Sequence, residues 1–188
     1  MTLFKNKYRI ESSRLKGWDY RTPGYYFVTI CTENREHYFG QISGGSMHLS
    51  AVGEIAAQYW REIPLHHVNG ELGEFVVMPN HVHGIVLIRE YGETFRGGVA
   101  TLRATSLREP EKSEISPKAG SLSVIIRSYK SAVTKWKGLN GFNEFAWQVR
   151  FYDRIIRDEQ SFQKIRAYIF DNPVNWELDK DNPSNLIM

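Results

Sequence analysis

Three stretches of the chain concentrate aromatic and β-branched residues in short runs bounded by turn residues. The first, 23–33, begins at a Pro-Gly pair and continues YYFVTICTE, which predicts a strand. The runs LGEFVVM and HVHGIVLI, within 72–89, flank Pro79-Asn80 and predict a hairpin with its turn at that pair. The third stretch, 146–156, reads AWQVRFYDRII and predicts a further strand.

Two stretches between these runs repeat their apolar residues at helical spacing. Ser50 can cap the first helix, which is expected to end before Pro64, and Ser121 or Ser123 can cap the second. The apolar stripes are Val52, Ile55, Ala56, Tyr59 and Trp60 in the first helix, and Leu122, Ile125, Ile126, Tyr129, Val133 and Trp136 in the second.

A last helix is expected to begin at Asp158 or Ser161. It ends near Asn172, because Pro173 follows and the residue before a proline avoids the helical region. The apolar residues Phe162, Ile165 and Ile169 mark the face that should pack on the sheet.

The predicted order is β-α-β-β-α-β-α. Its first six elements match the ferredoxin-like or RRM-like layout, an α+β fold in which an antiparallel sheet carries helices on one face. The seventh element is an added C-terminal helix. A short accessory hairpin is expected around Gly44-Gly45. The domain plan is a basic N-terminal arm at 1–22, one domain over 23–173 with a long surface loop at 90–120, and a tail at 174–188.

The composition narrows the class of protein. With 188 residues, of which 41% are hydrophobic and 24% charged, the chain suits one globular domain with its own core. No apolar run approaches the ~18 residues of a membrane span, and the N-terminus lacks a secretion signal, so we expect a cytoplasmic protein. The single cysteine, Cys31, excludes a disulfide framework and is expected to be a small buried residue.

The distribution of charge points to nucleic acid. The net charge is only +3, but 121–168 holds nine basic side chains against four acidic ones, whereas 169–188 holds four acidic side chains and one lysine. A basic body with an acidic end is typical of nucleic-acid-binding proteins, although many other soluble proteins carry such a face.

Two histidines directly follow the predicted hairpin turn. In a strand, residues two apart point to the same face, so His81 and His83 should project together while Val82 faces the other way. Two neutral imidazoles placed in this way can ligate one divalent cation. A His-x-His pair also arises by chance, and two unrelated histidines are the alternative.

Tyr168 and Asn172 are four residues apart on the last predicted helix, so they share a helix face at the border of its apolar stripe. A tyrosine in that position can reach into a cleft, or it can be a half-buried packing residue. With His81 and His83 holding a cation, the Asn172 amide oxygen could be a third ligand, and Tyr168 would lie beside the ion. A cation that polarises a phosphodiester would make this phenol a useful nucleophile.

The motif MPNHVHGIVLI resembles the HUH motif of single-strand endonucleases, and VMPNHVH is close to the form found in the REP-associated tyrosine transposases of bacteria. The resemblance continues in SLSVIIRSYKSAVTKW and in WQVRFYDRIIRDEQSFQKIRAYIFDNPVNW, over ~160 residues in order. It implies that 23–173 is an HUH transposase domain. It also implies that His81 and His83 are the metal pair, Tyr168 the catalytic tyrosine and Asn172 the third ligand. Arg154 stands where the family usually has histidine, and Tyr152 and Tyr129 are competing tyrosines.

The resemblance implies a transposase that cuts and rejoins single-stranded or hairpin DNA through a 5′-phosphotyrosine link, with Mg²⁺ or Mn²⁺ as cofactor and as a monomer or homodimer. Two imidazoles favour Mn²⁺. Three alternatives remain, namely a domesticated enzyme that processes its own repeats, a non-catalytic nucleic-acid-binding module, and a histidine-dependent metal hydrolase. The expected phosphate contacts are Arg127, Lys130, Lys135, Arg150, Arg154 and Arg157, and the candidate base-stacking residues are Trp18, Tyr20, Trp136 and Trp147.

Overall fold

The structure is a computed structural model, and it describes residue 15 and residues 17–90 and 118–185. Most of the expected basic arm, 1–14 and 16, and most of the expected loop, 91–117, lie outside the described residues. So do the last three residues of the chain. No helix in the described part is long and apolar enough to cross a membrane.

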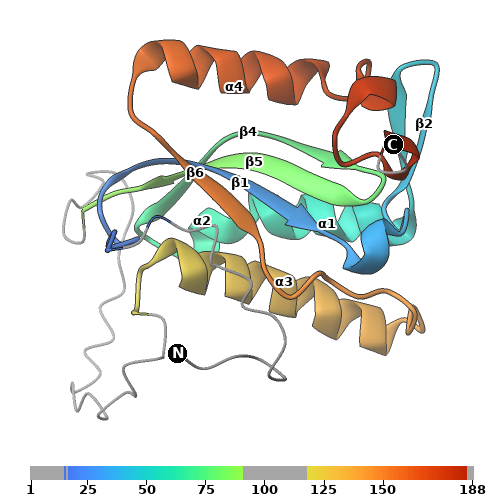
Figure 1. Cartoon of the computed structure of the whole chain (residues 1–188). Coiled ribbons are helices and arrows are strands. Elements are labelled where there is room, and N and C mark those ends of the chain that lie inside the picture. Colours follow the sequence, from blue (N-terminus) through green and yellow to red (C-terminus); the bar gives the residue numbers. More distant parts are fainter. Residues whose placement is uncertain (1–14, 16, 91–117, 186–188) are drawn as a thin grey trace, which may run out of the picture.

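A four-stranded antiparallel sheet forms the middle layer (Figure 1). Its strands are β1 (Gly24–Cys31), β4 (Gly70–Met78), β5 (His81–Ile88) and β6 (Tyr152–Ile156), in the spatial order β4-β5-β1-β6. Each neighbouring pair runs antiparallel. This order places the first and third strands of the predicted pattern in the centre, which confirms the ferredoxin-like α+β fold.

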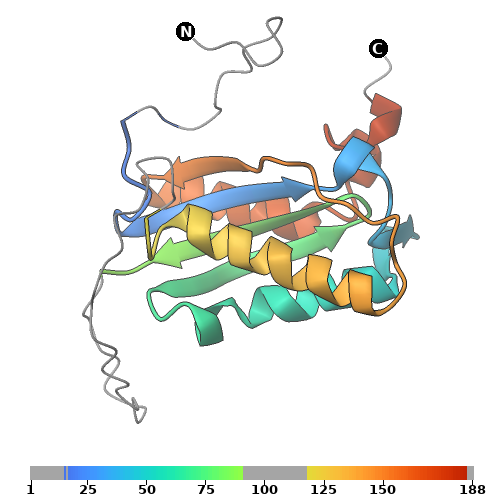
Figure 2. The same ribbon diagram turned by 90° about the horizontal axis from the view of Figure 1, so that it is seen from below.

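Helices cover both faces of this sheet. The helices α1 (Ala51–Arg61), α2 (Ile63–His66) and α3 (Leu122–Leu139) lie on one side, and α4 (Glu159–Asp171) lies on the other (Figures 1 and 2). The two helices of the βαββαβ pattern therefore share a face, as predicted, and the added helix covers the opposite face.

The larger core lies between the sheet and the α1/α3 layer. Trp60 of α1 is fully buried there, and its ring lies over Gly84 of β5. A Cβ atom at Gly84 would come within 2.3 Å of Cζ2 of Trp60, so this close approach requires glycine. Tyr20, Tyr129 and Trp147 also belong to or pack against this core, and Cys31 is buried as expected.

A smaller apolar cluster holds α4 against the sheet. Ile165 and Ile169 pack with Ile85 of β5 and Ile156 of β6, as the stripe predicted. Asp158 caps the helix by accepting a hydrogen bond from the backbone N–H of Ser161 at 2.7 Å.

The accessory hairpin consists of β2 (Gly40–Ser43) and β3 (Ser46–Leu49), with the predicted turn at Gly44-Gly45. Both glycines have positive φ, which such a turn requires. Ser50 caps α1 as predicted by accepting from the N–H of Gly53. Pro64 lies inside the short helix α2, near its N-terminus, where proline is tolerated.

The strand predicted over 146–156 is only half correct, because β6 contains Tyr152–Ile156 alone. Residues 146–151 do not continue the pairing of β6 with β1. They contribute one isolated bridge, between Thr32 and Trp147. Lys130 of α3 donates to the carbonyl oxygens of Gln148 and Val149, which lie in the part of the predicted strand outside β6.

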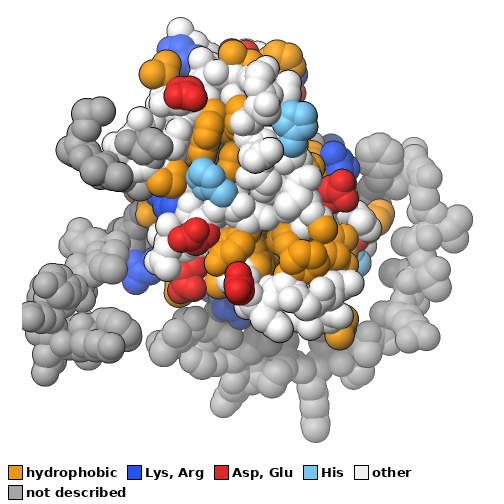
Figure 3. Space-filling model, turned by 90° about the vertical axis from the view of Figure 1, so that its right-hand side faces the viewer, with side chains coloured by type: hydrophobic (Ala, Val, Ile, Leu, Met, Phe, Trp, Pro, Cys, Tyr) orange, Lys and Arg blue, Asp and Glu red, His pale blue; other side chains and the backbone are white. Residues whose placement is uncertain are grey.

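Part of the segment expected to be a tail packs back on the domain. It contains two 3-10 helices, η2 (Trp176–Leu178) and η3 (Pro183–Asn185), and its buried residues are Trp176, Asp179, Asp181 and Asn182. Figure 3 views the end of the molecule where this segment lies. Among the described side chains, that face carries hydrophobic groups and both signs of charge, and no continuous basic surface.

Candidate active site

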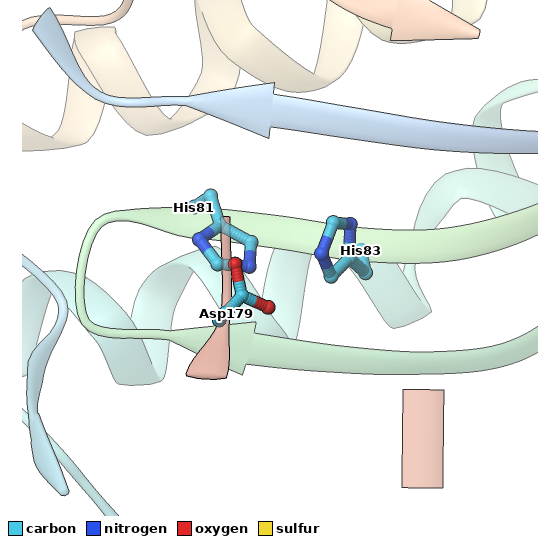
Figure 4. A group of neighbouring side chains, drawn as sticks. All are labelled: His81, His83 and Asp179. Atoms are coloured by element: carbon cyan, nitrogen blue, oxygen red, sulfur yellow. The ribbon is translucent and has the colours of Figure 1, made fainter. Parts of the chain in front are cut away.

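His81 and His83 project from β5 on the same side, toward Asp179 (Figure 4). Both imidazoles are fully buried, and their ring centroids are 4.3 Å apart. Val82 points the other way, into the larger core. The geometry that the two-residue period predicted is therefore present.

The orientation of the His81 ring is set by Asn80. Nδ1 of His81 is 2.8 Å from Oδ1 of Asn80, and Nδ2 of Asn80 donates to the carbonyl oxygens of Arg35 at 3.1 Å and Asp181 at 2.9 Å. Since the Asn80 amide nitrogen is engaged in this way, its oxygen must accept, and Nδ1 of His81 carries the proton. Nε2 of His81 is therefore unprotonated, and it is buried without a hydrogen-bond partner.

Both histidines are held in the neutral form. Burial, and then the positive charges of Arg35 and Lys180, lower the pKa of His81 to about 3. The pKa of His83 is lowered by burial first and by His81 second. Neutral imidazoles are the form that binds metal ions, so both side chains are in a form that could ligate a cation at neutral pH.

His83 is held between a hydroxyl group on each side. Its Nδ1 lies 2.9 Å from Oγ1 of Thr29, which is its direct partner across the β1–β5 pair, and its Nε2 lies 3.2 Å from the hydroxyl of Tyr168. The Thr29 hydroxyl can donate or accept, so it is compatible with either tautomer of His83.

Tyr168 and Asn172 reach the site from one face of α4, as predicted. The Tyr168 side chain is 38% exposed, whereas Asn172 is buried. The Asn172 amide nitrogen donates to Oδ2 of Asp179 at 2.7 Å, and its Oδ1 is buried without a partner. Two unsatisfied acceptors, Nε2 of His81 and Oδ1 of Asn172, thus lie in one site. Buried polar atoms of this kind call for an ion or a water.

Asp179 completes the group, and the sequence analysis did not single it out. Its Oδ2 accepts from the Tyr168 hydroxyl at 3.0 Å, and its Oδ1 accepts from the N–H of Asp181 at 2.6 Å. His81, His83 and Asp179 each offer a ligand atom within 4.8 Å of the others. A mixed set of imidazole and carboxylate donors suits a divalent transition ion such as Mn²⁺.

The Tyr168 phenol is protonated in this arrangement. Burial first, and the neighbouring Asp179 second, raise the pKa of Tyr168 above its ordinary value of 10.0. An ionised carboxylate can only accept, so the single phenolic proton lies on the bond to Asp179.

An ion pair between Arg35 and Asp181 fastens the segment that carries Asp179. Arg35 follows β1 in the 3-10 helix η1 (Glu33–Arg35) and has φ of 59°, in the left-handed region. Because Asn80 also bonds to the Arg35 and Asp181 carbonyls, one network connects His81 to the Asp179 segment.

The competing tyrosines lie in different surroundings. Tyr129 is buried on the α3 side, where its hydroxyl donates to the carbonyl oxygen of Ala56 at 3.1 Å. Tyr152 is 44% exposed and pairs with Thr29 across the β1–β6 ladder, so it shares the sheet face of His83.

The predicted phosphate-binding residues fall on two sides of the sheet. Arg154 of β6 pairs with Phe27, whose ring contacts Tyr168, so Arg154 lies on the face of the site. Arg127, Lys130 and Lys135 belong to α3, on the other side (Figure 1). Arg150 and Arg157 are exposed at the two ends of β6.

Two of the predicted base-stacking residues are committed to internal contacts. Tyr20 is buried, and Trp147 packs among Phe39, Phe145 and Tyr129. The Trp18 indole donates to the hydroxyl of Tyr26, and Trp136 stacks on Phe142.

Comparisons with known proteins give similar proteins of known sequence and of known structure. No protein-family model matches the chain. An uncharacterized protein of Haemophilus influenzae is 39% identical over 169 residues, which cover 90% of this chain and 91% of that protein. The structure of a REP-associated tyrosine transposase bound to a REP hairpin matches with a TM-score of 0.57 and 21% identity, covering 90% of this chain and 77% of that one. A protein of Deinococcus radiodurans R1, described as a candidate transposase, gives a TM-score of 0.43 at 15% identity, covering 84% and 97%.

Proposed function

The chain belongs to one family with the Haemophilus influenzae protein and has the fold of a REP-associated tyrosine transposase, and on that premise we propose that it is a metal-dependent DNA strand transferase with a single catalytic tyrosine. The observation that carries the proposal is the position of the Tyr168 hydroxyl, 3.2 Å from Nε2 of His83 and 3.0 Å from Oδ2 of Asp179. A partly exposed phenol beside a set of metal-binding donors is what attack on a phosphodiester requires.

The donors fit a divalent cation. Nε2 of His81 and Oδ1 of Asn172 are buried without partners, and His83 and Asp179 lie beside them. We assign His81, His83 and Asn172 as ligands and add Asp179 as a fourth candidate. A bound Mg²⁺ or Mn²⁺ ion would polarise a non-bridging phosphate oxygen, and the imidazoles favour Mn²⁺.

In the proposed reaction the Tyr168 oxygen attacks the scissile phosphorus. The bond from phosphorus to the 3′ oxygen breaks, which leaves a free 3′-OH strand and a 5′-phosphotyrosine link. Asp179 accepts the phenolic proton along the existing hydrogen bond, and the departing 3′ oxygen takes up a proton from solvent water. A second 3′-OH can attack the phosphotyrosine and restore both groups, so rejoining needs no nucleotide cofactor.

The proposed substrate is single-stranded DNA that folds into a hairpin. The solved transposase of the same fold is bound to a REP hairpin. On the site face of this chain, Arg154 offers a phosphate contact and the exposed Tyr152 offers a ring for an unpaired base. Arg150 and Arg157 extend the positive charge along β6. We place the reaction in the cytoplasm and leave open a monomer or a homodimer.

The alternatives predict different chemistry. A non-catalytic nucleic-acid-binding module has no use for a tyrosine hydroxyl bonded to a buried histidine and carboxylate. A metal hydrolase would release both DNA ends instead of keeping one on the protein. A domesticated enzyme would share the site and differ only in whether the DNA moves.

A nicking assay tests the proposal. A hairpin oligonucleotide with single-stranded flanks, labelled at its 5′ end, is incubated with the protein and Mn²⁺. We expect a shorter labelled product that a polymerase can extend, because its 3′ end carries a hydroxyl, and no product when EDTA is present. Cleavage that persists in EDTA would contradict metal dependence, and a 3′-phosphate product would contradict the direction of attack.

A further inference from the structure

The two histidines of the site have hydrogen-bond partners of different kinds. Nδ1 of His81 faces the amide oxygen of Asn80, which can only accept, so this ring has a single tautomer. Nδ1 of His83 faces the hydroxyl of Thr29 at 2.9 Å, and a hydroxyl can donate or accept. The chemistry proposed above gives Thr29 no part.

We propose that Thr29 is a positioning residue that holds His83 in either of its two neutral tautomers and lets the ring pass from one to the other. In one tautomer the ring donates to Tyr168, and in the other its Nε2 is free to ligate a divalent cation. The inference rests on the proposed function, because it concerns how one proposed ligand is made ready. It makes His81 a permanent ligand and His83 a conditional one.

The hydrogen bonds around Tyr168 determine the tautomer of His83 in this structure. The Tyr168 hydroxyl donates its only proton to Oδ2 of Asp179 at 3.0 Å. Its oxygen can therefore only accept from Nε2 of His83, 3.2 Å away, so Nε2 carries the ring proton. Nδ1 of the neutral ring is then unprotonated, and the Thr29 hydroxyl donates to it.

Ligation of a cation through Nε2 requires the opposite tautomer of His83. A nitrogen that binds a cation must be unprotonated, so the ring proton has to be on Nδ1. Nε2 loses a proton to water and Nδ1 gains one, and the charge of the ring does not change. By rotating its hydrogen, the Thr29 hydroxyl accepts from Nδ1 in this form. Neither tautomer therefore leaves Nδ1 buried without a partner.

The fold fixes the oxygen of Thr29 and leaves its hydrogen to rotate. Thr29 is buried in β1, between β5 and β6, where it pairs with His83 on one side and Tyr152 on the other. A β-branched side chain is restricted at χ1. The His83 ring is confined too, since its centroid lies 5.2 Å from that of Phe27 and 4.3 Å from that of His81. The exchange is therefore a shift of protons between two fixed groups.

The same exchange changes the surroundings of the Tyr168 oxygen. While Nε2 of His83 is protonated, it donates to this oxygen and engages a lone pair that attack on phosphorus would use. Moving the proton to Nδ1 removes that donor and leaves the bond to Asp179 in place. Thr29 thus connects the readiness of a metal ligand to the readiness of the nucleophile.

Nitrogen-15 NMR of the imidazole rings tests the inference, because protonated and unprotonated ring nitrogens have well-separated shifts. Spectra are recorded at one pH without DNA, first in EDTA and then with Zn²⁺ as a diamagnetic probe. In EDTA we expect the proton on Nδ1 of His81 and on Nε2 of His83, and with Zn²⁺ on Nδ1 of both rings. A metal-free His83 with its proton on Nδ1, or one that stays protonated at Nε2 in saturating Zn²⁺, would overturn the proposal.

Two substitutions of Thr29 separate positioning from packing. Thr29→Val keeps the shape of the side chain and removes the hydroxyl, so titration calorimetry should show Mn²⁺ binding about 10- to 100-fold more weakly. Thr29→Ser keeps the hydroxyl and should bind Mn²⁺ with an affinity close to that of the unmodified protein. Thr134→Val is the matched control, because the Thr134 hydroxyl donates to the Lys130 carbonyl on α3, on the other side of the sheet.

Equal Mn²⁺ affinities in Thr29→Val and Thr134→Val would contradict the role of Thr29, and so would an equal loss in Thr29→Ser and Thr29→Val. Circular dichroism checks the fold, and if Thr29→Val does not fold, the NMR spectra of the unmodified protein decide. A protein that shows both expected tautomers but never nicks DNA would contradict only the proposed function.

Discussion

Nδ1 of His81 lies 2.8 Å from Oδ1 of Asn80, and Asn80 is fixed in turn by the carbonyl oxygens of Arg35 and Asp181. This contact turns the unprotonated Nε2 of His81 into the site. A residue that does not itself reach the site therefore sets the direction of a proposed metal ligand.

Asn80→Ala should weaken Mn²⁺ binding by about 10- to 100-fold, the usual cost of losing a group that orients a ligand. Asn69→Ala is the matched control, because Asn69 is also buried and donates to the Gly120 carbonyl, away from the site. Isothermal titration gives both affinities. Equal affinities in the two variants would show that Asn80 does not orient the ligand.

The double variant His81→Ala, His83→Ala should lose the single Mn²⁺ site that the unmodified protein shows in the same titration. His48→Ala, at an exposed position on β3, should keep it. Asp179→Asn removes a charge and little volume, so a reduced affinity there would assign the carboxylate as a ligand. Full affinity in the double variant would remove the metal from the account.

Stability without metal should fall as the pH drops below 6.5. The pKa of His81 is 6.5 when unfolded and about 3 when folded, so between these values the unfolded chain binds more protons. The free energy of unfolding therefore rises with pH in this window, by up to about 1.4 kcal/mol per pH unit from this residue. Urea unfolding in EDTA between pH 4.5 and 6.5 measures the slope. It should be shallower in His81→Gln, and an unchanged slope would contradict burial of a neutral imidazole.

Lys130 should act on stability in a way that Lys135 does not. Its ammonium group donates to the carbonyls of Gln148 and Val149 and is partly buried, so Lys130→Ala leaves two acceptors without a charged donor. We expect a loss of about 1–3 kcal/mol. Lys135→Ala, on the exposed side of α3, should change the free energy of unfolding by less than about 0.5 kcal/mol. Similar values for both variants in urea titrations would show that the Lys130 contacts contribute nothing.

Local periodicity was sufficient to predict the parts of the site that lie within regular elements. His81 and His83 share a face because strands repeat every two residues, and Tyr168 and Asn172 share one because helices return after about four. Hydrophobic runs and turn residues likewise predicted the ferredoxin-like order of elements.

The missed parts depend on long-range contacts. Asp179 follows Pro173 in irregular chain, and only the acidic composition of 169–188 hinted at it. Its place in the site is set by the Asp181–Arg35 ion pair, between residues far apart in sequence. The strand predicted over 146–156 was too long, and the carbonyls of Gln148 and Val149, outside β6, accept hydrogen bonds from Lys130 of α3, a long-range contact that no local pattern records.

The central claim is that the Tyr168 oxygen becomes bonded to DNA. The protein is incubated with a hairpin oligonucleotide and Mn²⁺, denatured, digested with protease and analysed by mass spectrometry. We expect a nucleotide adduct on the peptide that contains Tyr168. Tyr168→Phe keeps the ring and its contact with Phe27, so it should fold and bind metal but form less adduct by orders of magnitude. An adduct that persists in Tyr168→Phe, or that maps to Tyr152, would contradict the account.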